Sequence, residues 1–266
     1  MKSDFSEKVV LITGAARGIG LSIAEAFGAR GATTCLVDIQ AAAGQEAVAQ
    51  LKSKGIQAAF LECDLSKPGA AQRMIQDVVA QHRRLDVLVN NARAGKRLDF
   101  MEETERSWDE AFNVNLKAAF FASQEAVRVM KEGGRILNIS SVAAQLVTHE
   151  SPAYHISKAG LVQMTRYLAV QAAPQQIGVN AIMPGFIVQD EHWERFAAEN
   201  NREFGALCAS YHPGGKPGRS LDVANAALFL CSSDSSYISG QCLTLDGAAT
   251  CQDQFALLRS FSKKDP

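Results

Sequence analysis

A tyrosine and a lysine four residues apart are the residues of this sequence best suited to proton transfer. Tyr154 and Lys158 would share one face of a helix, so their side chains could meet. Pro152 suits the first turn of that helix, and apolar residues at helical spacing follow Lys158. A free tyrosine titrates at about 10, and a neighbouring ammonium would favour the phenolate and lower that pKa. The pair is therefore a candidate general acid or base.

A serine that could hold a substrate oxygen lies just upstream. The run 134–139 predicts a buried strand, and Ser141 follows its carboxyl end. Because Tyr-x-x-x-Lys also arises by chance, an ordinary surface helix is an alternative that the pair alone leaves open. Gln145 and His149 lie between the serine and the tyrosine. They could line a substrate pocket or be loop residues without a chemical role.

A glycine-rich turn near the amino terminus indicates a dinucleotide site. The β-branched run 8–13 predicts a buried strand, which leads through the glycines into a helical pattern. Backbone N–H groups of such a turn, and the amino terminus of its helix, can face a pyrophosphate. A merely tight turn is the alternative. The candidate contacts in the turn are Gly14, Arg17, Gly18, Ile19 and Gly20.

An acidic residue after the next strand bears on which dinucleotide would bind. Strand 33–37 ends at Asp38, which could accept hydrogen bonds from both ribose hydroxyls of an adenosine and would repel a 2′-phosphate. The alternative is that Asp38 caps the helix beginning at Ala41. Arg17 could instead meet a phosphate. Asp38 would lie against the group that distinguishes NAD from NADP, so we expect NAD.

Strands alternate with helices along the chain, which favours a parallel sheet covered on both faces. We expect an α/β fold with a single domain over residues 1–249, built on a Rossmann-like doubly wound sheet of about seven strands. A long helical stretch is expected over about residues 105–130, and Asp222 is expected to cap the last helix. Residues 186–218 indicate a partly helical substrate-binding lid. Residues 250–266 indicate a C-terminal tail.

The composition narrows the class of protein. The 266 residues suit one large domain, and 27 Lys and Arg against 28 Asp and Glu indicate neither nucleic acid nor an anionic membrane surface as a partner. The six cysteines show no C-x-x-C spacing, so we expect reduced thiols and no metal site. Residues 1–8 carry no apolar signal segment, and no long apolar run is present. We expect a cytoplasmic protein.

Taken together, these motifs resemble those of the classical short-chain dehydrogenases/reductases over residues 6–248. Their order and spacing make a chance assembly an implausible competitor. The glycine spacing differs from that of the extended epimerases, and the single Tyr-x-x-x-Lys differs from the spacing of the divergent enoyl reductases. The matching residues are Thr13, Gly14, Gly18, Gly20, Asp64, Leu65, Asn90, Asn91, Ala92, Asn115, Ser141, Tyr154, Lys158, Pro184, Gly185, Ile187, Asp246 and Gly247.

The resemblance implies an NAD(H)-dependent oxidoreductase that interconverts a secondary alcohol and a ketone. Tyr154 would exchange a proton with the substrate, while Lys158 would lower the pKa of Tyr154 and bind the nicotinamide ribose. Ser141 would orient the substrate oxygen, and Asn115 would hold a water in a relay from Lys158. Family members are commonly tetramers, so a homo-oligomer (tetramer or dimer) is expected. Beyond the glycine turn, the implied cofactor contacts are Asp38, Asp64, Leu65, Asn91, Tyr154, Lys158, Pro184, Gly185 and Ile187.

Two departures from the family pattern affect the substrate and the nicotinamide. Arg93 replaces a glycine, and it could meet an anionic substrate group, turn to solvent or pair with a local acid. Gln189 stands where a threonine often holds the carboxamide of the nicotinamide. Because glutamine can also donate and accept hydrogen bonds, we expect the contacts to change and binding to be kept.

Two other functions compete: an NADPH-dependent 3-oxoacyl reductase, which Asp38 disfavours, and a catalytically silent NAD-binding regulatory module. The intact set of four catalytic candidates disfavours the silent module.

Overall fold

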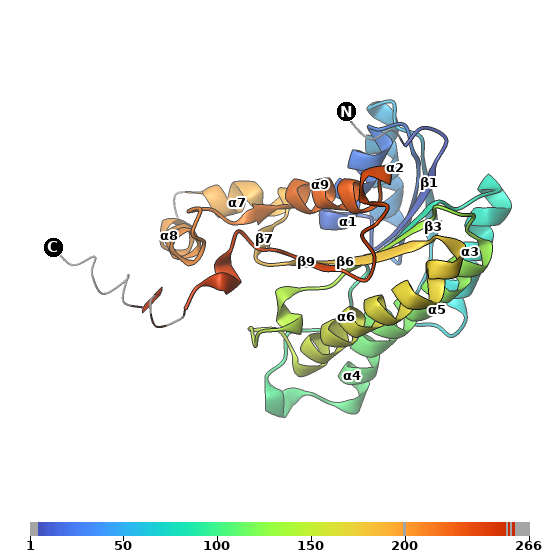
Figure 1. The fold of residues 1–266 in the computed structure, drawn as a ribbon. Coiled ribbons are helices and arrows are strands. Elements are labelled where there is room, and N and C mark those ends of the chain that lie inside the picture. Colours follow the sequence, from blue (N-terminus) through green and yellow to red (C-terminus); the bar gives the residue numbers. More distant parts are fainter. Residues whose placement is uncertain (1–4, 199–200, 254, 256, 259–266) are drawn as a thin grey trace.

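The computed structural model describes residues 5–198, 201–253, 255 and 257–258. These residues form one domain around a seven-stranded sheet in which all strands run parallel, in the order β3-β2-β1-β4-β5-β6-β9 (Figure 1). The predicted Rossmann-like doubly wound sheet is confirmed. The strands are β1 Val9–Thr13, β2 Thr33–Asp38, β3 Ala58–Glu62, β4 Val87–Asn90, β5 Arg135–Ile139, β6 Gly178–Pro184 and β9 Cys242–Leu245.

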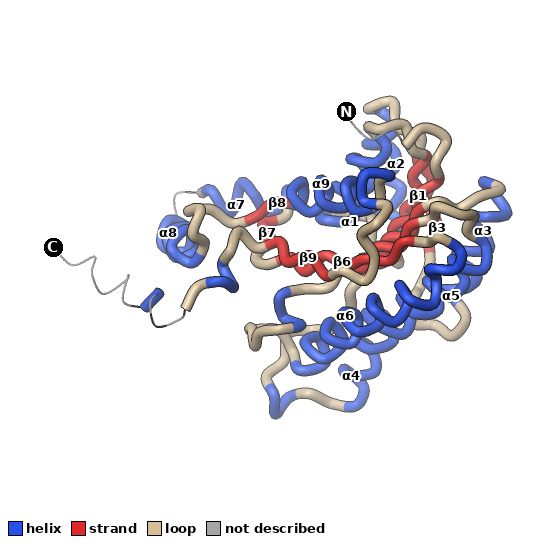
Figure 2. Tube along the Cα trace, in the orientation of Figure 1, coloured by secondary structure: helices blue, strands red, loops and turns tan. Residues whose placement is uncertain are grey.

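Helices cover both faces of this sheet (Figure 2). One layer holds α1 (Gly18–Gly28), α2 (Ala41–Ser53) and α9 (Ser220–Leu230), and the other holds α3 (Ala70–His82), α4 (Glu105–Phe112), α5 (Ala119–Val129) and α6 (Pro152–Ala172). Successive side chains of a strand point to opposite faces. In β1, Val10 and Ile12 accordingly pack in the first layer, while Val9 and Leu11 pack in the second. Burial on both faces explains why the strands are continuous apolar runs.

The order of the strands places a crevice between β1 and β4. The chain builds outward from β1 to β3, and then returns past β1 to begin the other half at β4. The loops that follow β1 and β4 therefore leave the sheet in different directions, which opens a ligand crevice at the carboxyl ends of the strands. The glycine turn follows β1, and residues 91–99 follow β4.

Two helix predictions need correction. The stretch 105–130 is not one regular α-helix, because a π-helical segment, Asn113–Ala118, separates α4 from α5. Such single-turn insertions are frequent at functional sites. Asp222 caps α9 from its third position and not as the residue before the helix, because α9 begins two residues earlier at Ser220. Its carboxylate accepts a hydrogen bond from the backbone N–H of Arg219 at 2.8 Å, so it satisfies the helix start from within the first turn.

The segment predicted as a partly helical lid contains a short parallel pair, β7 (Ile187–Val188) with β8 (Gly218–Arg219), and the helices α7 (Trp193–Ala197) and α8 (Arg202–Tyr211). Its aromatic side chains pack on one another, with Phe186, Phe196 and Phe204 in edge contacts. In the tail, residues 254, 256 and 259–266 lie outside the described residues. None of the described helices combines the length and apolarity needed to cross a membrane. Short 3₁₀ segments complete the fold at Phe100–Glu102, Val142–Ala144, Ala173–Gln175, Asp190–His192, Ser233–Ser235 and Ala249–Cys251.

Candidate active site

Tyr154 and Lys158 lie in the first two turns of α6 and point inward. The helix starts where Ser151 accepts a hydrogen bond from the backbone N–H of Tyr154 at 3.3 Å, with Pro152 in the first turn. Tyr154 is 9% exposed and Lys158 is 3% exposed. The lysine Nζ lies 5.6 Å from the centre of the tyrosine ring and donates to the carbonyl of Ile139, at the end of β5, at 2.7 Å. The two side chains meet, as their spacing predicts.

Ser141 completes the group from the neighbouring strand. Its hydroxyl caps the short segment after β5 by accepting from the backbone N–H of Ala143 at 3.1 Å. It lies close enough to the phenol of Tyr154 to lower the pKa of that group. A carbonyl or hydroxyl oxygen of a substrate placed between these two hydroxyls could therefore accept or donate hydrogen bonds at both.

Burial dominates the electrostatics of the pair. Burial raises the pKa of Tyr154 above its ordinary value, and the positive charge of Arg93 and the hydrogen bond from Ser141 counter that rise only in part. Burial, reinforced by repulsion from Arg93, lowers the pKa of Lys158 to about 7. Burial therefore outweighs the neighbouring charges at the phenol, and the lowering of its pKa by Lys158 stays a prediction. The lysine is itself buried and directs its charge at the carbonyl of Ile139.

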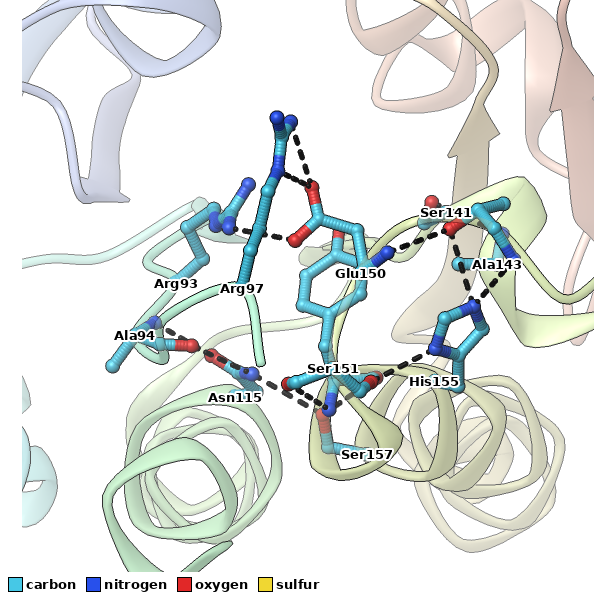
Figure 3. Close-up of polar contacts among 12 residues, drawn as sticks. Arg93, Ala94, Arg97, Asn115, Ser141, Ala143, Glu150, Ser151, His155 and Ser157 are labelled. Atoms are coloured by element: carbon cyan, nitrogen blue, oxygen red, sulfur yellow. Dashed lines mark hydrogen bonds and ion pairs between the residues drawn. The ribbon is translucent and has the colours of Figure 1, made fainter. Parts of the chain in front are cut away.

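Asn115 lies in the π-helical segment and links two parts of the site (Figure 3). Its Oδ1 accepts from the backbone N–H of Ala94 at 2.8 Å, and its Nδ2 donates to the carbonyl of Ala94 at 3.2 Å and to the hydroxyl of Ser157 at 3.1 Å. The side chain therefore fastens the loop after β4 to α6. Ser157 is a positioning partner that the sequence motifs do not indicate.

The glycine turn after β1 has room for backbone and little else. Gly14 and Gly18 have φ angles of +64° and +58°, which favour glycine. A Cβ atom on Gly14 would lie 2.7 Å from the Cα of Ala92, and one on Gly20 would lie 2.4 Å from the carbonyl oxygen of Gly14. The first N–H groups of α1 receive no side-chain cap from Arg17, so they remain available to an anion. These features fit a pyrophosphate.

Asn91 and Thr13 hold the glycine turn against β4. The amide of Asn91 donates to the carbonyls of Thr13 and Gly14, each at 2.9 Å. The hydroxyl of Thr13 accepts from the backbone N–H groups of Asn91 and Ala92, each at 3.0 Å. The side chain of Asn91, predicted as a cofactor contact, is thus engaged in building the cradle itself.

Asp38 ends β2 and Asp64 follows β3, and both lie at the edge of the same crevice. One carboxylate oxygen of Asp38 accepts from the backbone N–H of Ala16 and the other from that of Gln40, both at 3.1 Å. Asp38 therefore orders the glycine turn as well as the start of α2. Asp64 accepts from the backbone N–H and the hydroxyl of Ser66, which lowers the pKa of the carboxyl, and Leu65 beside it is partly buried.

The end of β6 brings the lid to the glycine turn. Pro184 ends the strand, and Gly185 packs so tightly on Asp246 that a Cβ atom would lie 2.6 Å from the Asp246 Cβ. Ile187 begins β7. The side-chain oxygen of Gln189, two residues further on, lies 2.6 Å from the point where a Cβ on Gly18 would be. Gln189 is therefore placed over the turn that follows β1.

A family model described as enoyl-(acyl carrier protein) reductase matches residues 14–250. A 3-oxoacyl-[acyl-carrier-protein] reductase of Chlamydia pneumoniae is 32% identical over 91% of this chain and 97% of its own length. A probable galactose dehydrogenase of Rhizobium meliloti is 34% identical over 92% of this chain and 95% of its own length. The crystal structure of a short-chain dehydrogenase from Burkholderia cenocepacia in complex with NADP has a TM-score of 0.83 and 31% identity, covering 92% of this chain and 99% of that one.

The chain belongs to the short-chain dehydrogenase/reductase family. Its members are oxidoreductases that bind a nicotinamide cofactor. In this short-chain dehydrogenase/reductase, the loop after β4 departs from the family pattern at Arg93. The guanidinium of Arg93 pairs with Glu150 at 3.2 Å, and Arg97 pairs with the same carboxylate at 3.1 Å (Figure 3). Pairing with a local acid, one of the alternatives open for Arg93, is thus the contact observed.

The loop between Ser141 and Tyr154 contains the residue that motif reasoning missed. Glu150 has no counterpart among the matched motifs, and only its contact with two arginines indicates its importance. Gln145 and His149 are exposed on this loop. His155 orders the loop by accepting from the backbone N–H of Thr148 at 2.8 Å.

Proposed function

We propose that this protein is an NAD(H)-dependent oxidoreductase that interconverts a secondary alcohol and a ketone. The observation that supports it most is the convergence of Tyr154, Ser141 and Lys158 beside the glycine turn. Arg93 connects the two halves of the site, because its neighbour Ala92 packs on Gly14 while its guanidinium lies over Tyr154.

The residues of the crevice would hold the cofactor in an extended arrangement. The turn from Gly14 to Gly20 and the amino terminus of α1 would bind the pyrophosphate. Asp38 would bind the adenosine ribose. A nicotinamide, when bound, supplies or accepts the hydride. The remaining contacts proposed are Asp64 and Leu65 at the adenine, Asn91 along the cofactor, and Pro184, Gly185 and Ile187 at the nicotinamide.

Tyr154 would exchange the proton with the substrate oxygen, which Ser141 would orient. Burial lowers the pKa of Lys158 to about 7, which suits a group that gives and takes a proton near neutral pH. The side chain of Asn115 is engaged by Ala94 and Ser157, so a relay water would be left to its main-chain carbonyl. This is the refinement that the structure suggests for the proton path.

Replacing Tyr154 by phenylalanine tests the assignment. Turnover of any active alcohol with NAD should fall by about two to four orders of magnitude, because the group that accepts the proton of the alcohol is lost. Binding of NAD, followed by calorimetry, should be retained. Retained turnover would contradict the proposed role of Tyr154. A wild-type protein that binds NAD and turns over none of a panel of polyols, hydroxy acids and hydroxysteroids would favour the silent regulatory module.

The preference for NAD over NADP rests on Asp38. Its carboxylate is fixed by two backbone N–H groups, so it cannot easily turn away from a 2′-phosphate. Arg17 is exposed in the adjacent turn and favours the competing NADPH-dependent 3-oxoacyl reductase. Turnover with NADH and NADPH distinguishes the two. Asp38→Ser should raise the NADPH-to-NADH ratio of kcat/KM by about tenfold or more, and Asp64→Ser serves as a control at the next strand.

The substrate side of the site supports a small polar substrate that carries an anionic group. Two guanidiniums share one carboxylate, so the cluster of Arg93, Arg97 and Glu150 has surplus positive charge. Gln145 and His149 would line the same side. Arg93→Ala should raise KM for the true substrate, whereas an unchanged KM would remove support for the anionic group.

Self-association would use the helical face formed by α4, α5 and α6. A groove of about 680 Å³ lies there, lined by apolar and aromatic side chains that include Phe112, Phe120 and Tyr167. A second copy of the chain would cover it in a homodimer or homotetramer.

We further propose a cytoplasmic location, because all six cysteines are free thiols. Residues 186–218 would act as the substrate lid of the domain over 1–249, with 250–266 as its tail.

A further inference from the structure

Arg93 places a positive charge over the ring of Tyr154. Its guanidinium carbon lies 4.9 Å from the ring centre, within the range at which a cation is attracted to an aromatic face. The backbone next to it is held firmly, because Ala92 packs against Gly14 and donates its N–H to Thr13. The guanidinium is therefore not on a freely moving loop.

Glu150 fixes the other end of the arginine. Its side chain is 15% exposed. One carboxylate oxygen forms an ion pair with Arg93 at 3.2 Å, and the other forms one with Arg97 at 3.1 Å (Figure 3). Glu150 lies four residues before Tyr154, at the approach to α6, so the ion pair joins the two loops that flank the phenol. One carboxylate neutralises only one of the two guanidiniums, which leaves net positive charge beside Tyr154.

Arg93 adds a charge to that of Lys158, whose ammonium donates to the carbonyl of Ile139. Burial lowers the pKa of Lys158 to about 7, so the lysine loses its charge as the pH rises. An arginine keeps its charge at every pH of interest. After burial, which raises the pKa of Tyr154, Arg93 is the largest influence and lowers it.

The other groups around the phenol act less strongly. From the loop after β5, Ser141 lowers the pKa of Tyr154 by hydrogen bonding; Glu150 raises it and Arg97 lowers it further. On α6 itself, the imidazole of His155 lies edge-on, 6.4 Å from the phenol between ring centres. Arg93 is thus the cation nearest to the face of the ring, at 4.9 Å, against 5.6 Å for Lys158.

We propose that Arg93 is a positioning residue for proton transfer at Tyr154: held over the phenol ring by Glu150, it supplies the permanent positive charge that favours the phenolate. The inference rests on the proposed function, in which Tyr154 exchanges the proton with the substrate. Alcohol oxidation needs the phenolate as base, so Arg93 would extend that reaction to lower pH.

A titration without substrate or cofactor tests the charge effect. The chain has four tyrosines, so the tyrosinate absorbance of the wild type minus that of Tyr154→Phe isolates one phenol. The same difference in an Arg93→Gln background should shift to higher pH. Arg97→Gln also removes one positive charge from the Glu150 carboxylate, but it leaves the guanidinium of Arg93 over the ring. This variant should shift the titration less. Arg93→Lys should restore part of the effect. A phenol that titrates at or below the wild-type pH in Arg93→Gln, or an equal shift in Arg97→Gln, would overturn the proposal.

Turnover supplies the second readout. In Arg93→Gln, kcat for alcohol oxidation should fall on the order of tenfold at neutral pH and recover as the pH rises, since one nearby charge shifts such an equilibrium by about that factor. A loss confined to KM, with the pH profile of kcat unmoved, would show that Arg93 only contacts substrate, against this proposal. If Tyr154→Phe stays active, the proposed function fails, while the absorbance titration still decides whether Arg93 acts on the phenol.

Discussion

Replacing Lys158 by methionine should remove a pH dependence of stability that this one buried amine creates. Burial, with repulsion from Arg93, lowers the pKa of Lys158 from 10.5 to about 7. Between these two values the unfolded chain keeps a proton that the folded protein gives up. Because the unfolded state binds more protons there, the stability contributed by this group rises with pH across that window. Below pH 7 the full cost of burying the charged amine is present.

The magnitude follows from the size of the shift. One pKa unit corresponds to about 1.4 kcal/mol, so the free energy of unfolding of the wild type, relative to the methionine variant, should rise by about 3 to 4 kcal/mol from pH 7 to pH 10. Methionine retains the length and most of the apolar stem of lysine, so the cavity left is small. Other groups that titrate above pH 9, including the buried thiols of Cys35 and Cys231, affect both proteins alike and cancel in the difference.

Urea unfolding at pH 7, 8.5 and 10, followed by circular dichroism, measures this difference directly. Lys52→Met on the exposed side of α2 is the matched control, and its curve should run parallel to that of the wild type. If the Lys158→Met and wild-type free energies also run parallel from pH 7 to pH 10, the lysine is charged throughout. The proton relay proposed through it would then lose its physical basis.

Three further outcomes are expected. Gly18→Ala should destabilise the fold by about 1–2 kcal/mol, since its φ of +58° disfavours a Cβ, and should abolish NAD binding in calorimetry. Gly205→Ala, in the open inside α8, should leave NAD binding unchanged and should not lower stability, since alanine is the better helix former; equal losses in both variants would contradict the role of the turn. Asn138→Ala should cost about 2–4 kcal/mol in urea unfolding, because it leaves the buried amide of Asn90 without one acceptor; a loss below about 1 kcal/mol would contradict that account. Tyr167→Asp, on the rim of the groove, should reduce the sedimentation mass of an oligomer, whereas an unchanged mass would place the interface elsewhere.

The sequence by itself determined the features that depend on residues close together along the chain. Apolar runs become strands because two helical layers bury them, and the glycines of 14–20 mark a turn that only backbone can fill. Tyr154 and Lys158 meet because helical geometry places residues four apart on one face. These relations hold wherever the rest of the chain goes, so motif reasoning could identify the family and the candidate residues.

Only the tertiary structure decided how distant residues act on one another. It brings Arg93 and Arg97 to Glu150, places Gln189 over Gly18 and directs the charge of Lys158 to a strand carbonyl. A pKa depends on burial and on charges from several loops, and no local pattern contains that information. For this reason the sequence identified Tyr154 as the candidate acid or base, whereas only the folded chain placed a second cation, Arg93, over its ring.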